Sequence, residues 1–207
     1  HDRGYFPRHG LYDRRYSPRE ASFVYKNLQS YLSDLSGVVT HGTLHLPGYV
    51  KSVRDGYTLP RAKPEIVSET PTTALVKGNW AFGFVSAMYA LELAMEKAAE
   101  QNVAVVSLVQ ANHIGRLGEY AETATARGMV ALIWSGGQGV EVPLVVPYGG
   151  SRPTVLSTNP MAIGVPAGDE PPMVLDFATT AVAHSKAVTA RNENKSLPPD
   201  SIVDKDG

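Results

Sequence analysis

Residues 103–130, VAVVSLVQANHIGRLGEYAETATARGMV, decide the fold of this chain. The run 103–109 is apolar, rich in β-branched side chains and as long as a typical strand, and after Gly115 the apolar residues recur at the period of a helix. The polar pair Asn112 and His113 is therefore expected at a strand-to-helix turn. Ligands of open α/β sheets collect outside the carboxyl ends of the strands, so this turn is the first place to look for function.

His113 is the first catalytic candidate. Its unperturbed pKa lies near neutrality, which makes histidine the side chain best suited to give and take a proton at cellular pH. The alternative is structural, because a histidine at the start of a helix can simply bond a loop carbonyl. The turn alone leaves both interpretations open.

Composition bounds the class of protein. The 207 residues are 43% hydrophobic, enough to bury a substantial core in one large or two small domains. A formal net charge of -1 gives no reason to expect nucleic acid or an anionic membrane as a partner, and no apolar run approaches the ~20 residues that span a bilayer. Cysteine is absent, which excludes disulfides and thiolate metal sites. We expect a cytoplasmic protein.

The first 19 residues carry five arginines and four aromatic residues without a sustained period. We expect residues 1–19 to be a disordered basic arm, with contact to RNA as the less favoured alternative. A helix-start signal follows at Ser17, where serine, proline and glutamate occupy the positions of a capping box. An apolar stripe then continues to Gly37 and predicts an amphipathic helix.

Two histidines four residues apart, His41 and His45, follow this helix. On one face of a helix they could share a metal ion, but Gly42 and Pro47 weaken any such helix, and no glutamate follows His41 as a metalloprotease requires. We therefore predict no metal ligands. A histidine-ligated hydrolase or lyase that uses His41, His45 and His113 stays as an alternative.

An alternation of helices and strands predicts an α/β fold. Residues 51–71 are polar and proline-punctuated, and are interpreted as a surface connection or domain boundary. The elements that follow are a short strand at 73–76, an amphipathic helix opening at Gly83, the strand 103–109, the helix after Gly115 and a strand at 129–134. This order indicates α/β layers around a sheet with parallel pairings. We expect residues 20–71 to form a helical, substrate-side segment and residues 72–207 an α/β cofactor-binding domain.

Two later segments raise the question of a dinucleotide site. Residues 135–139, SGGQG, offer glycines at positions 137 and 139, but the third glycine and the following helix of a Rossmann fingerprint are missing. Residues 173–175 predict a buried strand that delivers Asp176 at its end, and small residues follow at 177–183. Such small residues let a helix or turn lie close to a flat ligand, or simply allow tight helix packing.

Five motifs in this order resemble the type-2 malate/L-lactate dehydrogenases, relatives of the ureidoglycolate, sulfolactate and diketogulonate dehydrogenases. They are GVVTHG with LPGY (37–42 and 46–49), NHIG (112–115), STNP (157–160), DFATT (176–180) and VDKDG (203–207). No single motif is specific for the family, but five of them in the same order over most of the chain are specific for it. The resemblance runs from residue 37 to the last residue.

The resemblance implies an NAD- or NADP-dependent oxidoreductase that interconverts a 2-hydroxy acid and a 2-oxo acid. The implied fold is α/β but not Rossmann, with a helical N-terminal part, a mixed-sheet cofactor-binding domain and a homodimeric assembly. His113 matches the family's proton donor and acceptor, and His41 matches a second histidine of the same pocket. The substrate-side candidates are Thr40, His45, Tyr49, Thr158 and Asn159, and the cofactor-side candidates are Gly137, Asp176, Ala178, Thr179 and Thr180.

The chain departs from the family pattern at two positions of the first motif. Thr40 stands where serine is usual, which keeps the hydroxyl group. His45 stands where the family commonly has an arginine suited to a bidentate grip on the substrate carboxylate. A histidine has fewer donors and is mostly neutral at pH 7, so the substrate class is left open.

The resemblance also predicts that the chain is a fragment. It implies that family members continue beyond Asp206 and Gly207, a dipeptide typical of a turn, and that their later part completes the cofactor site. We expect uncovered apolar faces, weak or no dehydrogenase activity and self-association for these residues alone. A non-catalytic fragment or binding module is therefore the second alternative.

Overall fold

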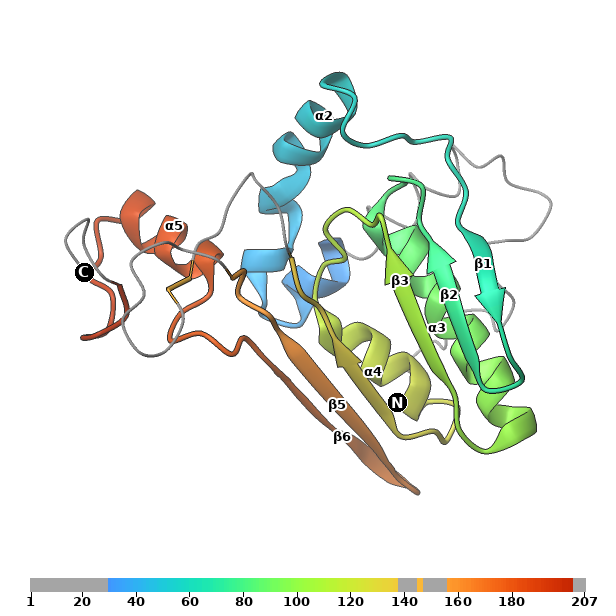
Figure 1. Ribbon diagram of the computed structural model, residues 1–207. Coiled ribbons are helices and arrows are strands. Elements are labelled where there is room, and N and C mark those ends of the chain that lie inside the picture. The colour runs from blue at the N-terminus through green and yellow to red at the C-terminus, as the bar shows by residue number, and fades with distance from the viewer. Residues whose placement is uncertain (1–29, 138–144, 147–155, 203–207) are drawn as a thin grey trace. The chain divides into compact units, whose positions relative to one another are not determined.

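The computed structural model describes residues 30–137, 145–146 and 156–202 (Figure 1). They belong to two compact units, His1–Gly115 and Arg116–Gly207, each with a three-stranded sheet of its own. The expected basic arm at 1–19 and the start of the helix predicted from Ser17 lie outside the described residues. The predicted division into parts at residues 20–71 and 72–207 stays a prediction.

The first unit begins with helical and turn structure. Residues 30–35 are helical, and the chain then turns at Gly37, whose φ of +75° belongs to the left-handed region that favours glycine. Two 3₁₀ turns follow, η1 (Val39–His41) and η2 (Thr43–His45), and lead directly into α2 (Leu46–Arg54), which has Pro47 in its first turn. His41 and His45 therefore lie at the ends of two successive 3₁₀ turns, and not on one face of an α-helix.

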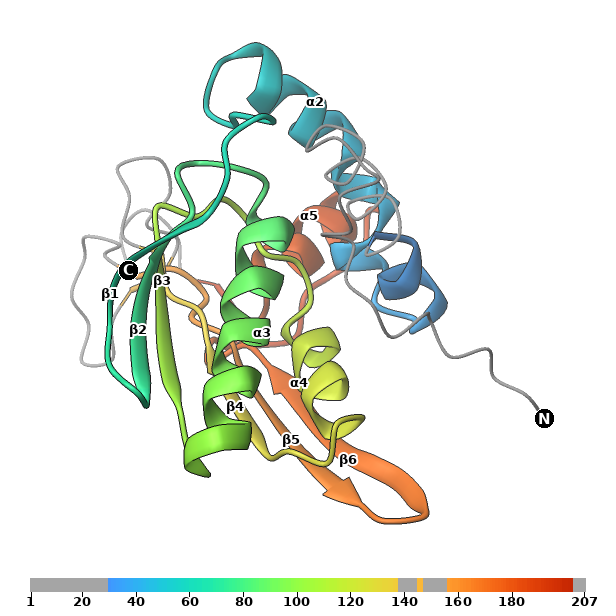
Figure 2. The same cartoon turned by 90° about the vertical axis from the view of Figure 1, so that its right-hand side faces the viewer.

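The sheet of the first unit has the order β1 (Glu65–Glu69), β2 (Thr73–Lys77) and β3 (Val105–Val109). The strands β2 and β3 are parallel and are connected by α3 (Gly83–Gln101), as the sequence predicts. Figure 2 shows α3 against one face of this sheet, where Ala74 and Val76 are buried. Because successive residues of a strand point to opposite faces, Val105 lies on the face away from α3. Val105 is 63% exposed, so this face is open to solvent.

One strand of this sheet was not expected. The sequence indicates a polar connection at residues 51–71, yet residues 65–69 form β1, which pairs antiparallel with β2. All five residues of β1 are exposed, so the strand carries no alternation of apolar and polar side chains by which the sequence could reveal it.

The second unit consists of α4 (Leu117–Thr125), a sheet of β4 (Ala131–Trp134), β5 (Met161–Ala167) and β6 (Glu170–Phe177), and α5 (His184–Asn192). The strands β5 and β6 form an antiparallel hairpin, and β4 pairs antiparallel with β5. The helix α4 packs on this sheet, where a Cβ at Gly164 would lie 2.9 Å from the Ala121 carbonyl oxygen. Glycine at position 164 thus permits the close approach.

Two sequence expectations for this unit were wrong in part. Parallel pairing was expected, but the described strands pair parallel only between β2 and β3, because the β5–β6 hairpin supplies β4 with an antiparallel neighbour. The strand at 173–175 exists within the longer β6, but it is mostly exposed and not buried, because β6 is an edge strand with one face open. Asp176 accordingly lies inside the strand, next to its last residue.

The face of the second sheet away from α4 is apolar and accessible. Its most exposed members are Leu132 (54%), Trp134 (65%), Met173 (66%) and Leu175 (52%). None of the described helices combines the length and apolarity that crossing a membrane requires.

Candidate active site

The loop after β3 is held in place by Asn112. Its side-chain amide nitrogen donates hydrogen bonds to the backbone carbonyls of Trp80 (3.0 Å) and Ala81 (2.9 Å), with a longer contact to that of Tyr57 (3.4 Å). The backbone N–H of Trp80 returns a hydrogen bond to the Gln110 carbonyl at 2.9 Å. These bonds fix residues 110–113 against the segment that enters α3, and so they fix the backbone of His113.

Two glycines permit this loop to lie against α3. A Cβ at Gly83, the first residue of α3, would lie 2.1 Å from the carbonyl oxygen of Asn112 and 2.3 Å from that of His113. Gly115 has a φ of +79°, and a Cβ there would lie 2.4 Å from a ring carbon of Phe84. Contacts this short do not occur in folded proteins, so both positions require glycine. The glycine at the start of a helix was the sequence signal for this contact, and the sequence interpretation missed it.

Three imidazole rings gather at this loop. The ring of His113 is stacked with that of His41 at a centroid distance of 5.7 Å, and lies 5.1 Å from that of His45. The rings of His41 and His45 are 6.3 Å apart. Phe84 meets His113 edge-on at 6.2 Å, although sequence periodicity had assigned Phe84 only to the core. We call His41, His45, Tyr49, Phe84 and His113 the histidine pocket.

Tyr49 and Thr40 complete the arrangement. The Tyr49 hydroxyl oxygen lies 2.8 Å from Nδ1 of His113, a hydrogen bond between α2 and the loop after β3. His45 donates from Nε2 to the backbone carbonyl of Thr40 at 2.7 Å, and the Thr40 hydroxyl lies 3.2 Å from Nδ1 of His41. All five site candidates from the first unit therefore lie together in the structure.

The electrostatics of the pocket favour a neutral His113. Burial, followed by the positive charges that His45 and His41 can carry, lowers the pKa of His113 to about 3. Burial also raises the pKa of Tyr49 above its usual value. The His113 residue as a whole is nevertheless exposed to solvent, which lets water moderate the pKa shift. An anion beside the ring would favour its protonated form.

The pocket does not have the form of a metal centre. Within residues 30–137, 145–146 and 156–202, no three histidine, cysteine, aspartate or glutamate side chains converge as metal ligands do. His45 already uses Nε2 for the Thr40 carbonyl. The geometry thus gives no support to the alternative of a histidine-ligated hydrolase or lyase.

The second unit brings four more candidates together around Ser157. The Ser157 hydroxyl donates to the side-chain oxygen of Asn159 at 2.7 Å and accepts the backbone N–H of Gly137 at 2.9 Å. The Thr179 hydroxyl donates to the Asn159 carbonyl at 3.0 Å, and its N–H donates to the Thr158 carbonyl at 3.2 Å. These residues follow β4, precede β5 and follow β6, so they meet at one end of the sheet. We call this group the Ser157 turn cluster.

Asp176 lies apart from the Ser157 turn cluster. Its carboxylate accepts the backbone N–H of Gly118 at 2.7 Å, in the first turn of α4, where a negative charge stabilises a helix. Ala178 and Thr180 follow β6 and are half-buried, and the Thr180 hydroxyl donates to the Val182 carbonyl at 2.9 Å. The structure therefore gives Asp176 a helix-capping contact, and its role toward a cofactor stays a prediction.

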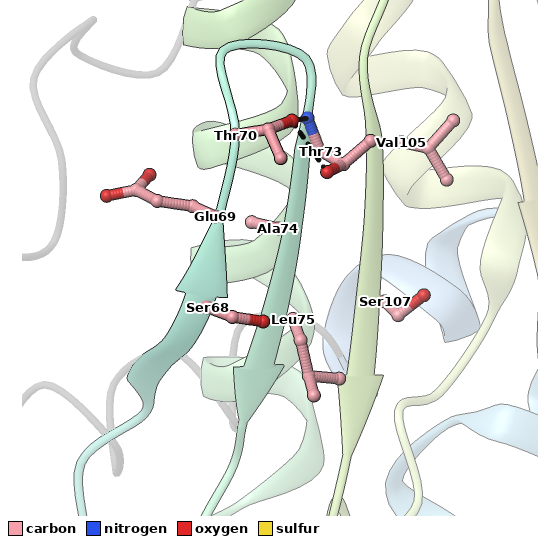
Figure 3. A pocket seen from close by; sticks show the side chains of 8 residues that line it. All are labelled: Ser68, Glu69, Thr70, Thr73, Ala74, Leu75, Val105 and Ser107. Carbon is pink, nitrogen blue, oxygen red and sulfur yellow. Dashed lines mark hydrogen bonds between the residues drawn. The ribbon is translucent and has the colours of Figure 1, made fainter.

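An open hollow of 360 Å³ lies elsewhere in the first unit, on the exposed face of β1–β3 (Figure 3). Its lining includes Glu69 and Thr70 near the β1–β2 turn, and Val105 and Ser107 on β3. No site candidate from the sequence lines this hollow.

Comparisons with known proteins agree with the motifs. Residues 8–207 match the protein family described as malate/L-lactate dehydrogenase. The chain is 36% identical over 175 residues to the L-sulfolactate dehydrogenase of Methanothermobacter thermautotrophicus, covering 84% of this chain and 50% of that protein. It is 34% identical over 189 residues to hydroxycarboxylate dehydrogenase B of Escherichia coli O157:H7, covering 91% of this chain and 51% of that protein.

The fold agrees as well. The sulfolactate dehydrogenase structure from Methanocaldococcus jannaschii superposes with a TM-score of 0.76 at 32% identity, covering 92% of this chain and 52% of that one. The chain spans about half the length of the curated relatives that it matches.

Proposed function

The chain belongs to the malate/L-lactate dehydrogenase family, and we propose that it serves hydride transfer between NAD(P) and a 2-hydroxy acid/2-oxo acid pair. The observation that carries this proposal is the placement of His113. Its ring is hydrogen-bonded to Tyr49 and stacked beside that of His41, and the residue is exposed to solvent. A histidine held in this way can serve as a general acid and base, while the family supplies the class of reaction.

In the proposed reaction His113 handles the proton. When bound, the nicotinamide supplies or receives the hydride. Because Nδ1 of His113 is engaged by Tyr49, Nε2 is the nitrogen through which the ring can meet the substrate oxygen. A histidine in reach of that oxygen gives its proton as the carbonyl is reduced and takes one as the alcohol is oxidised.

The substrate side is proposed to include His41, His45 and Thr40. These groups lie next to His113: His41 can offer an imidazole N–H and Thr40 a hydroxyl to a carboxylate, whereas His45 can donate only from Nδ1 of a protonated ring. His45 stands where the family pattern has arginine, and its Nε2 is already committed to the Thr40 carbonyl. We therefore propose a carboxylate grip weaker than a bidentate arginine would give.

The Ser157 turn cluster is proposed to hold the cofactor, together with Ala178, Thr180 and Asp176. The donor set fits the hydroxyl and phosphate oxygens of a dinucleotide: among the described residues, the side-chain N–H groups of Asn159 have no hydrogen-bond partner. A Cβ at Gly137 would lie 3.3 Å from the Cβ of Ser157, so glycine at position 137 lets the backbone of this turn lie close to Ser157. The family resemblance assigns Thr158 and Asn159 to the substrate side, so we propose that these two residues lie where the cofactor and the substrate meet, with Gly137 and Thr179 on the cofactor side.

The test uses the full-length protein. Titrations with NADH and NADPH should show saturable binding of at least one cofactor, and a panel of 2-oxo acids should then reveal turnover. His113→Ala should lower kcat by about 10²–10⁴-fold, as expected for loss of a general acid/base, and should leave cofactor binding intact. Unchanged turnover in this variant would remove the assignment of His113, and failure to bind either cofactor would contradict the proposed function. Light scattering tests the homodimer, which stays a prediction.

A further inference from the structure

One hydrogen bond controls the ring of His113. Among the described residues, Tyr49 is its only hydrogen-bond partner, at 2.8 Å from Nδ1, and Nε2 has none. Histidine has two distinct ring nitrogens, and the partner of one decides whether the other carries the proton in the neutral ring. The direction of the Tyr49 hydrogen bond therefore determines what Nε2 presents to a ligand.

The surroundings of Tyr49 hold its hydroxyl in place. Its ring meets Phe84 edge-on at 5.5 Å, and lies 5.9 Å from the ring of His45 and 6.0 Å from that of His113. Burial raises the pKa of Tyr49, so the hydroxyl keeps its proton across the physiological range. A phenol is a good donor, and the lone pair of a neutral imidazole nitrogen is a good acceptor. Donation from Tyr49 to His113 is the favoured direction.

We propose that Tyr49 is a positioning residue that sets the tautomer of His113: its hydroxyl donates to Nδ1, so the neutral ring carries its single proton on Nε2. For the role of this proton in hydride transfer, the inference rests on the proposed function. A ring with a proton on Nε2 meets the carbonyl oxygen of a 2-oxo acid as a donor. The pocket is therefore prepared for the oxidised member of the substrate pair.

The direct test is nuclear magnetic resonance of the full-length protein labelled with ¹⁵N-histidine. Two-bond ¹H–¹⁵N correlation spectra distinguish a protonated ring nitrogen from an unprotonated one, and loss of the signals in His113→Gln assigns them. We expect an unprotonated Nδ1 and a protonated Nε2 at neutral pH. Observation of a proton on Nδ1 in the unsubstituted protein would overturn the proposal without any variant.

Substitution of Tyr49 tests the cause. Tyr49→Phe removes only the hydroxyl and keeps the ring contacts, so we expect the fold to persist and the two His113 nitrogens to approach a mixture of tautomers. Tyr57→Phe is the matched control, because Tyr57 is 58% exposed and its backbone carbonyl, not its hydroxyl, contacts Asn112. An unchanged His113 spectrum in Tyr49→Phe would refute the positioning role.

Kinetics give a second readout. In a protein with dehydrogenase activity, Tyr49→Phe should lower kcat for 2-oxo acid reduction by about 10- to 100-fold, the scale of a misplaced catalytic group, with a smaller change in KM. Tyr57→Phe should leave both constants unchanged. The spectra decide the tautomer independently of activity, so a failure of the proposed function and a failure of this inference are told apart. Equal kcat in Tyr49→Phe and the unsubstituted protein would overturn the inference.

Discussion

The histidine pocket of the first unit and the Ser157 turn cluster of the second are built in different ways. In the pocket, rings from η1, η2, α2, α3 and the loop after β3 pack at centroid distances between 5.1 and 6.3 Å. In the cluster, hydroxyl, amide and backbone groups at one end of a single sheet bond one another. The first therefore depends on side chains that titrate, and the second on hydrogen bonds between groups that do not.

The largest expected effect tests the pocket's side chains. His45→Arg should lower KM for simple 2-oxo acids by about 10- to 100-fold in an active full-length protein, because a charge-assisted hydrogen bond to the carboxylate contributes roughly 1.5–3 kcal/mol. Steady-state kinetics with each 2-oxo acid measure this change. Leu44→Arg adds the same charge at an adjacent, 55% exposed position and should have little effect. Loss of all activity in His45→Arg would instead identify His45 as a specificity residue for another substrate.

The next prediction tests the pocket's backbone. Gly83→Ala should lower the free energy of unfolding by about 1–3 kcal/mol, because its Cβ would overlap the carbonyl oxygens of Asn112 and His113. Gly48→Ala in α2 is the matched control: no atom lies within 4 Å of its Cβ, and it should stabilise by about 0.5–1 kcal/mol. Urea denaturation measures both. Equal effects of the two substitutions would contradict the close contact at Gly83.

A smaller effect on stability is expected for Ser157, whose hydroxyl bonds both Gly137 and Asn159 in the Ser157 turn cluster. Ser157→Ala removes the acceptor of the Gly137 N–H and the donor to Asn159, and should cost about 1 kcal/mol of unfolding free energy. Its cost should not vary between pH 5 and pH 8, since none of the bonded groups titrates there. Ser201→Ala, which loses only a local hydrogen bond to Pro198, should change stability less. A cost that grows with acidity would argue against a non-titrating cluster.

The last prediction separates the two regions by the pH dependence of stability. His113 has a folded pKa of about 3, below the ordinary value near 6.5, so between these values the unfolded chain binds more protons. His113 should thus lower the free energy of unfolding as pH falls from 6.5 toward 3, and solvent exposure of the residue should moderate this effect. The slope of urea midpoint against pH should be shallower in His113→Gln. An identical slope in both proteins would show that His113 does not titrate in this way.

The sequence predicted the elements whose apolar residues are periodic. The strand at 103–109, the helix opening at Gly83, and the helix after Gly115 appear as β3, α3 and α4, with ends shifted by a few residues or fewer. The sequence does not show the exposed strand β1 or the antiparallel pairing of β4 with β5, because an edge strand shows little burial and strand pairing depends on distant segments.

The same limit applies to the site. The sequence placed His113 at the turn after a strand, but it could not show that Tyr49, 64 residues earlier, bonds Nδ1. Only the resemblance to a family brought His41, His45 and Tyr49 to the same pocket. The hydrogen bonds of Ser157 to Gly137 and Asn159 also depend on the tertiary pairing that brings the end of β4, the start of β5 and the end of β6 together, and no local sequence pattern indicates this pairing.

The two glycines that hold the loop after β3 have a consequence for protein engineering. Gly83 and Gly115 leave no room for any side chain, so variation at either position would move His113 itself. The short turns η1 and η2 face no such restriction at Thr43 and Leu44, which are both exposed. A library designed to change substrate range should therefore vary residues 40 and 43–45, and should keep the histidine at 41 and the glycines at 42, 83 and 115 unchanged, because a Cβ at Gly42 would overlap the Asp34 carboxylate.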